Sequence, residues 1–186
     1  MGKMHSDGVT LIEALVTLAV IAVVLAVGVP AVREIVATNR MSVAVNDVVT
    51  SLHLSRAEAG RRSEQAVICA TAAWDSPAAT CDGGNLADGW IVFIDDNPRN
   101  SAHDAGETIV LGHEPIGTGI DLTSPPLVRF SSLGIASADV PGDINFLLCD
   151  DRGNRTAGGV TAARMINMTA TGRPRVVTTP ADVVCP

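Results

Sequence analysis

The first third of the chain is dominated by a long apolar run. Residues 14–32 include no charged side chain over 19 positions, and starting the run at Val9 adds only Glu13. As an α-helix, about 21 such residues would rise roughly 32 Å, which matches the roughly 30 Å hydrocarbon core of a bilayer. The pattern therefore predicts a membrane-spanning helix over residues 9–32.

An amphipathic pattern follows the apolar run. Apolar residues recur at i, i+4, i+7 and i+11, the spacing of one helix face; they are Met41, Val45, Val48 and Leu52, with Val32, Ile35 and Val36 upstream. Most charged side chains lie off this stripe. We expect the helix to continue over residues 33–62, to end near Gly60 and to pack the stripe on a head domain. At Pro30, which lacks an N–H group, we expect a bend or local melting.

From residue 63 to residue 186 the pattern changes to short apolar segments separated by Pro and Gly, which is typical of strands and turns. The expected strands are 66–70, 89–95, 107–114, 127–131, 143–149, 164–169 and 173–178. No helical period of useful length appears after Gly60. The expected fold class is α+β: a long N-terminal transmembrane helix packed on a small, mostly antiparallel β-rich head.

Charge is unevenly distributed along the chain. Hydrophobic residues make up 47% of it and the mean hydropathy is +0.31, with the excess concentrated near the N-terminus. The net charge of −7 argues against bulk coating of nucleic acid. Residues 151–186 nevertheless hold five arginines against two aspartates, a net charge of +3. This sign asymmetry allows a local basic surface at the C-terminal end.

Four cysteines all follow the apolar run, and none of them forms a C-x-x-C pair; they are Cys69, Cys81, Cys149 and Cys185. An even count without zinc-type spacing indicates two disulfides formed in an oxidising compartment. The spacing by itself leaves all three connectivities open.

No catalytic set emerges, so we expect no enzyme activity, no cofactor and no metal. The four histidines have neither a nucleophile nor ligand spacing around them, and no phosphate-binding loop occurs. The oxygen-rich loop after Asp95 fails the calcium-loop template because Arg99 stands where a ligand is required. We interpret that loop as a solvated hairpin connection, Asp150-Asp151-Arg152 as surface turn chemistry, and Trp74 and Trp90 as packing residues.

A short polar leader precedes the apolar run. It ends in Asp7-Gly8, and Glu13 follows five residues after the glycine. A secretory signal peptide would need a basic n-region, a shorter apolar core and a small-x-small cleavage site, whereas Lys3 is the only basic residue here. The order of features resembles the class III leader of type IV prepilins and pseudopilins.

That resemblance implies processing and assembly. Residues 1–8 would be the leader peptide, cut between Gly8 and Val9 by a prepilin peptidase that then methylates the new N-terminus. Phenylalanine is usual where this chain has Val9. Glu13 matches the glutamate of the family, and Pro30 matches the position where these helices commonly kink.

A carboxylate in an apolar helix needs a physical reason, because it costs about 2.5–3.5 kcal/mol on membrane-insertion scales. Pairing of Glu13 with the new amine at Val9 of a neighbouring subunit would offset that cost in a low dielectric and set the axial register of the incoming subunit. A glutamate that snorkels to the membrane surface is the alternative.

The head resembles the GspH/FimT branch of minor pilins. The matching segments are 81–95, 146–150 and 172–175, followed by the terminal Cys185. The resemblance implies the disulfides Cys69–Cys81 and Cys149–Cys185. In FimT members that serve natural transformation a GRxR motif binds DNA, and here the motif is Gly172-Arg173-Pro174-Arg175. We expect these arginines to face one side of an extended strand and to fork onto phosphates, supported by Arg152, Arg155 and Arg164.

Two functions of different class follow. The first is a minor pilin of a type IV pilus that binds double-stranded DNA weakly and without sequence preference. The second is a structural pseudopilin of a type II secretion system with protein partners only. Both imply insertion in the bacterial inner membrane with a single pass, a periplasmic C-terminal head, and assembly with other pilins or pseudopilins.

Overall fold

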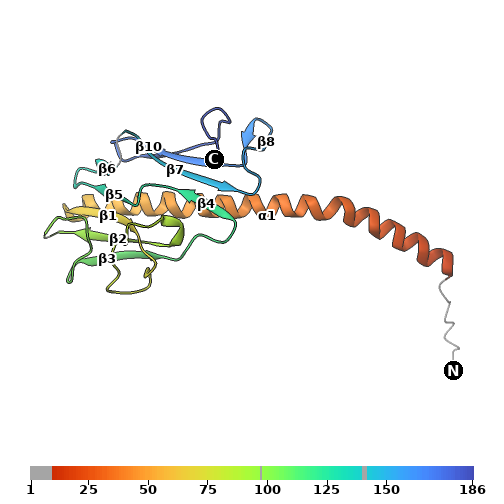
Figure 1. Cartoon of the computed structure of the whole chain (residues 1–186), viewed down its shortest axis with the longest axis horizontal. Coiled ribbons are helices and arrows are strands. Elements are labelled where there is room, and N and C mark those ends of the chain that lie inside the picture. The colour runs from red at the N-terminus through yellow and green to blue at the C-terminus, as the bar shows by residue number, and fades with distance from the viewer. Residues whose placement is uncertain (1–9, 97, 140–141) are drawn as a thin grey trace, which may run out of the picture. The chain divides into compact units, whose positions relative to one another are not determined.

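The computed structural model describes residues 10–96, 98–139 and 142–186 (Figure 1). The chain divides into two compact units, an N-terminal unit that ends at Asn39 and a head unit, Arg40–Pro186. Gly8 and Val9, together with the leader, lie outside the described residues.

Helix α1 comprises Leu11–Arg62 and contributes to both units. Thr10 caps it: the Thr10 hydroxyl accepts a hydrogen bond from Glu13 N at 3.3 Å, and Thr10 O accepts the bond from Ala14 N at 3.1 Å. The helix runs without interruption through Pro30 (Figure 1). Local melting at Pro30 is therefore not found.

The N-terminal unit exposes an apolar surface. Its large hydrophobic side chains between Leu11 and Val36 are between 41% and 79% exposed. Within the described residues, α1 is the one helix long and apolar enough to cross a membrane, and none of its apolar window is buried in the protein. A bilayer or neighbouring subunits would be needed to cover this surface, because water solvates it poorly.

The head unit contains two antiparallel sheets and a short hairpin. The first sheet has the order β3-β2-β1-β5-β6, with bounds Thr108–His113, Trp90–Asp95, Gln65–Ala70, Leu127–Phe130 and Ala136–Ala138. The second has the order β11-β10-β7-β4, with bounds Pro174–Val177, Arg164–Met168, Ile144–Asp150 and Ile120–Thr123. The hairpin pairs β8 (Thr156–Ala157) with β9 (Val160–Thr161), and a 3-10 turn, η1, spans Leu86–Asp88.

All seven expected strands are present, and each end lies within one residue of the expected position. The helix ends at Arg62, two residues after the expected Gly60. Four further strands were not expected from the sequence: β4, β6, β8 and β9, which have two to four residues each. Such short segments are stabilised by pairing with a longer neighbour, as β4 is by β7, and they carry too few positions to show a period.

The part of the predicted α1 stripe that begins at Met41 forms the centre of the head. The expectation is wrong for the upstream residues Val32, Ile35 and Val36, which are 42% to 60% exposed. Met41, Val45, Val48 and Leu52 are at most 5% exposed and join one core cluster with residues of both sheets. Figure 1 shows the C-terminal half of α1 with strands of the two sheets on either side. Alternation places Phe146, Leu148 and Ile166 inward from the second sheet, whereas β1 and β2 are buried on both faces.

One hydrogen bond ties the helix to the first sheet inside this core. Trp90, which is fully buried, donates from its indole nitrogen to Ser51 Oγ at 3.0 Å, and Ser51 in turn donates to Asp47 O at 2.8 Å. The outer face of the Trp90 ring stacks on His113 with centroids 3.9 Å apart. The expected packing role of Trp90 is therefore what the structure shows.

Two disulfides close the head: Cys69–Cys81 and Cys149–Cys185, the two pairs that the family resemblance implied. The first joins β1 to the loop before η1, and the second joins β7 to the C-terminal segment. The chain-entropy relation assigns about 3 and about 4 kcal/mol to loops of these lengths. The second disulfide holds the chain that follows β11 against the second sheet.

Candidate functional site

The GRPR segment forms a tight turn into an edge strand. Strands β10 and β11 pair as a hairpin in which Met168 faces Pro174 and Asn167 faces Arg175. The turn between them is closed by a hydrogen bond from Gly172 N to Thr169 O at 2.9 Å. Because β11 is the last strand of its sheet in the described structure, one side of its backbone has no strand neighbour, and Pro174 has no N–H group to donate.

Gly172 is buried beneath the turn in a conformation that requires glycine. Its φ is +69°, and an added Cβ would lie 2.3 Å from the carbonyl oxygen of Gly134 and 3.3 Å from Phe130 Cε1. No side chain fits there. The turn is therefore seated on the connection between β5 and β6, and Ala170 O in the turn accepts a backbone hydrogen bond from Ala136 N, the first residue of β6, at 2.9 Å.

Arg173 and Arg175 flank Pro174, and both are exposed. Within the described residues, neither guanidinium has an ion pair or a side-chain hydrogen bond. Two cations without a carboxylate partner, held on a rigid turn, can each donate a pair of N–H groups to an incoming anion. Of the six arginine and glycine positions expected to bind DNA, these two have the most suitable placement.

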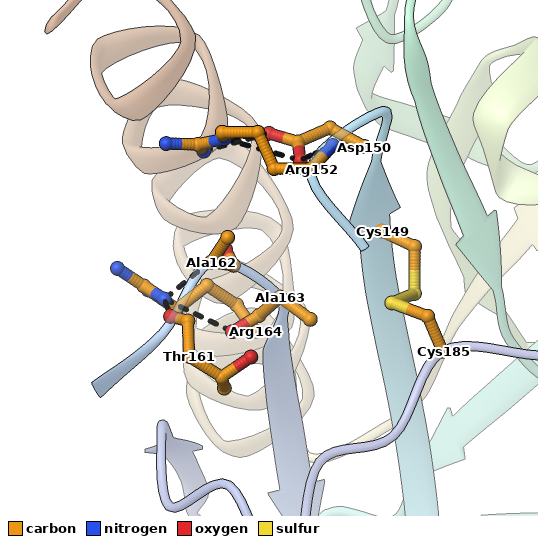
Figure 2. A network of polar contacts seen from close by, with 8 residues as sticks. All are labelled: Cys149, Asp150, Arg152, Thr161, Ala162, Ala163, Arg164 and Cys185. Carbon is orange, nitrogen blue, oxygen red and sulfur yellow. Dashed lines mark hydrogen bonds and ion pairs between the residues drawn. A yellow bond between two sulfur atoms is a disulfide. The ribbon is translucent and has the colours of Figure 1, made fainter. Parts of the chain in front are cut away.

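Two other expected DNA contacts, Arg152 and Arg164, have partners inside the head. Arg152 donates to both oxygens of Asp150, at 2.6 Å from Nη2 to Oδ2, and the two side chains are only 7% and 5% exposed (Figure 2). The expectation of a solvated surface turn is wrong for Asp150 and Arg152, because the two side chains pair with each other and are nearly buried, whereas Asp151 between them is exposed.

Arg164 satisfies carbonyls of its own turn. Its Nη1 donates to Ala163 O at 2.9 Å, to Ala162 O at 3.1 Å and to Thr161 O (Figure 2). Burial lowers the pKa of Arg164, and the nearby charge of Arg152 lowers it further. Arg155 is exposed at the base of the β8–β9 hairpin. Arg152 and Arg164 of the five tail arginines thus already have partners within the head.

At the other end of the chain, Glu13 occupies the third position of α1 and is exposed. Thr10-x-x-Glu13 has the spacing of a capping box, a local signal that the sequence analysis did not use. A glutamate there also suits the positive end of the helix dipole. Neither the capping-box spacing nor the helix dipole prevents the Glu13 carboxylate from pairing with a neighbouring subunit in an assembled filament.

Described side chains at the end of β2 and in the loop that follows make more internal hydrogen bonds than expected. Asp95 is fully buried, and its Oδ2 accepts hydrogen bonds from Gln65 Nε2 at 2.6 Å and from Ser101 N at 2.9 Å. The expectation of a solvated loop is wrong for this residue. Burial raises the pKa of Glu107, whose carboxylate caps Asp96 N and Asp104 N. Where the chain is described, no three acidic, His or Cys side chains are placed to hold a metal.

A groove that the sequence analysis missed lies between α1 and the β5–β6 connection. It has a volume of about 540 Å³ and is lined on the helix by His53, Arg56, Ala57, Gly60 and Arg61, and on the connection by Ser132, Leu133 and Gly134. We call it the α1 groove. The helix positions have the spacing i, i+3, i+4, i+7 and i+8, which marks one face, but only the tertiary structure brings residues 132–134 opposite it.

Comparison with known proteins finds two matching families along the chain. Residues 44–172 match the family described as type II transport protein GspH, and residues 3–29 match the prokaryotic N-terminal methylation motif. No curated protein matches the chain. The GspH match ends at Gly172, so Arg173 and Arg175 lie beyond it.

Among solved structures, the type IV minor pilin FimU of Pseudomonas aeruginosa strain PAO1 has the same fold. It aligns with a TM-score of 0.51 at 14% identity, covering 79% of this chain and 93% of that one. A second crystal form of FimU gives a TM-score of 0.46 at 14% identity, with coverage of 77% and 96%. The long apolar helix and antiparallel sheets described above are thus a pilin-like fold.

Proposed function

The chain belongs to the GspH family of type IV pilin-like proteins, and we propose that this minor pilin or pseudopilin binds double-stranded DNA through Arg173 and Arg175 in a type IV pilus that serves natural transformation. The observation that carries the proposal is the pair of exposed arginines on the Gly172 turn, with which no carboxylate in the described part of the chain forms an ion pair. A chain with a net charge of −7 presents cations there, which favours a phosphate partner.

The proposal includes the route to the filament. A prepilin peptidase cuts between Gly8 and Val9, residues 9–32 anchor the mature chain in the inner membrane, and residues 33–62 continue the helix to the head. Residues 63–186 complete the head in the periplasm. The N-terminal methylation match and the exposed apolar surface of α1 support this route.

Binding by so few cations should be weak and sensitive to salt. Two to four phosphate contacts give a slope of log affinity against log salt of about −2 to −4. We expect both arginines to contact phosphates and not base edges. Because phosphate contacts carry no sequence information, the binding should have no sequence preference. Such binding suits capture by a filament that moves its cargo.

The test compares variants of the full-length protein in non-ionic detergent. Fluorescence anisotropy of a labelled duplex, measured over a range of salt concentrations, should show binding by the wild type. The variant with both Arg173→Ala and Arg175→Ala should bind more weakly at every salt concentration. Its slope of log affinity against log salt should be closer to zero by about 2.

The matched control is Arg33→Ala with Arg40→Ala, which removes the same charge from exposed positions on α1 and should leave the slope unchanged. Equal affinity of the wild type and the Arg173/Arg175 variant would contradict the proposal.

The description of the matching family favours a second candidate, a structural pseudopilin of a type II secretion system. In that case the head contacts only proteins, and Arg173 and Arg175 are solvated surface residues. Deleting the gene would then reduce export of secreted proteins and leave transformation frequency unchanged, whereas the DNA-binding function predicts the reverse.

A further inference from the structure

The β5–β6 connection joins the arginine turn to the α1 groove. Gly134 has a φ of +74°, and a Cβ on it would lie 2.8 Å from Arg56 Nε, so the Arg56 side chain lies directly against its backbone. The carbonyl of the same Gly134 is the group that Gly172 approaches most closely. Arg56 and Arg173 are thus separated by two packed glycines, although they are far apart in sequence.

Charge in the α1 groove is not balanced. Glu58 makes ion pairs with Arg61 at 2.6 Å and with Arg62 at 3.0 Å. Hydrogen bonds from these two guanidinium groups lower the pKa of Glu58 to about 2, so it is an anion at neutral pH and offsets part of their charge. Over the part of the chain that is described, no carboxylate pairs with Arg56, which is half-buried.

A half-buried guanidinium without an acceptor has lost part of its hydration and gained no partner. The groove is open to solvent, and its lip is Leu133, whose side chain is 81% exposed. The groove therefore presents the N–H donors of Arg56 on the helix side and uncharged residues on the side of the β5–β6 connection. The carboxylate of Glu58 is already paired with two other arginines. An anion with an extended backbone fits this surface.

We propose that the DNA-binding surface extends from Arg173 and Arg175 across Gly134 into the α1 groove, where Arg56 contacts the phosphate backbone of the same duplex. This inference rests on the DNA-binding function proposed above. Each strand of a duplex carries one phosphate per about 3.4 Å of axis, so cations spread along one surface meet different phosphates of one molecule. Arg56 then adds one phosphate contact to those of the turn.

Full-length protein in non-ionic detergent with a labelled duplex again provides the test. Arg56→Gln should weaken binding and bring the salt slope about 0.9 closer to zero, the value for one lost phosphate contact. Arg56→Lys should keep the slope of the wild type. Both substitutions remove the guanidinium group that lies against Gly134, so the difference between their salt slopes reports charge and not packing.

Two controls complete the design. Leu133→Ala reshapes the groove without changing its charge and should leave the slope unchanged. Arg99→Gln removes one arginine that is paired with Glu64 outside the groove, and it should also leave the slope unchanged.

The outcomes separate this inference from the function on which it rests. If Arg173→Ala with Arg175→Ala brings the slope closer to zero but Arg56→Gln does not, the turn binds DNA and the extension into the groove is refuted. If Arg56→Gln and Arg56→Lys bring the slope closer to zero by the same amount, packing and not charge is responsible, and the inference is again refuted. Absence of binding by the wild type refutes both.

Discussion

At the scale of single residues, glycine conformation decides where the candidate DNA contacts stand. Gly172 provides the left-handed turn that starts β11, and it does so while touching the backbone of Gly134. Arg173 follows immediately, so its position depends on this close approach. The sequence motif names the arginines, but the glycine determines where they lie on the molecule.

Gly172→Ala is predicted to destabilise the head by at least about 2 kcal/mol. The left-handed conformation costs a non-glycine residue of order 1–3 kcal/mol, and the new methyl group would also collide with a backbone oxygen. Chemical denaturation of the detergent-solubilised protein, followed by tryptophan fluorescence, measures the loss.

Gly158→Ala is the matched control, because Gly158 has a φ of +58° but no atom within 4 Å of its missing Cβ. It should lose about 1 kcal/mol, the conformational cost alone. Equal losses in the two variants would contradict the close approach at Gly172.

At the scale of elements, one helix has two different environments. The stripe of α1 from Met41 to Ala59 is buried between two sheets, whereas the apolar side chains from Leu11 to Val36 are exposed in the single chain. Ser51 marks the first environment: its hydroxyl is the acceptor that makes burial of the Trp90 indole N–H possible. Helix and first sheet are thus joined by a polar contact as well as by apolar packing.

Ser51→Ala is predicted to cost about 1–3 kcal/mol of folding stability, since it leaves the buried indole N–H of Trp90 without a partner. Ser55→Ala is a suitable comparison, because Ser55 is buried one turn later and donates only to Ser51 O at 2.8 Å. It should cost less. Thermal denaturation of both variants tests this, and a larger loss for Ser55→Ala would contradict the assigned role of Ser51.

At the scale of the whole molecule, the exposed apolar surface of the N-terminal unit indicates that a bilayer or neighbouring subunits cover it in the cell. GspH-family membership and the methylation match imply assembly with other pilins or pseudopilins after processing. Within the described residues, Glu13 is the acidic residue of that surface nearest to the N-terminus, and no described side chain forms an ion pair with its carboxylate. We propose that it pairs with an amine of a neighbouring subunit.

Glu13→Gln is predicted to leave membrane insertion intact and to prevent incorporation into filaments. The amide cannot form an ion pair, while its lower desolvation cost favours the membrane. Fractionation of cells into membranes and sheared filaments, followed by immunoblotting, measures the distribution. Glu34→Gln makes the same change beyond the apolar run and should be incorporated normally; normal incorporation of Glu13→Gln would refute the pairing.

The sequence by itself determined the features that arise from local periodicity. The apolar run, the stripe of α1 and seven strands follow from positions that repeat at helical or strand spacing, so each can be read within a short window. The leader and the head motifs gave the family, and with it the disulfide pairs. Short strands such as β6 have too few residues for such a signal.

Only the tertiary structure decided which charged side chains remain available. Arg152 and Arg164 have the same composition signal as Arg173 and Arg175, yet the fold provides the first two with Asp150 and with turn carbonyls. Likewise, Arg56 lies against Gly134, and Gly134 in turn lies against Gly172 of the arginine turn, although the three residues are far apart in sequence. Partners of a charge depend on distances through space, and local spacing along the chain does not contain them.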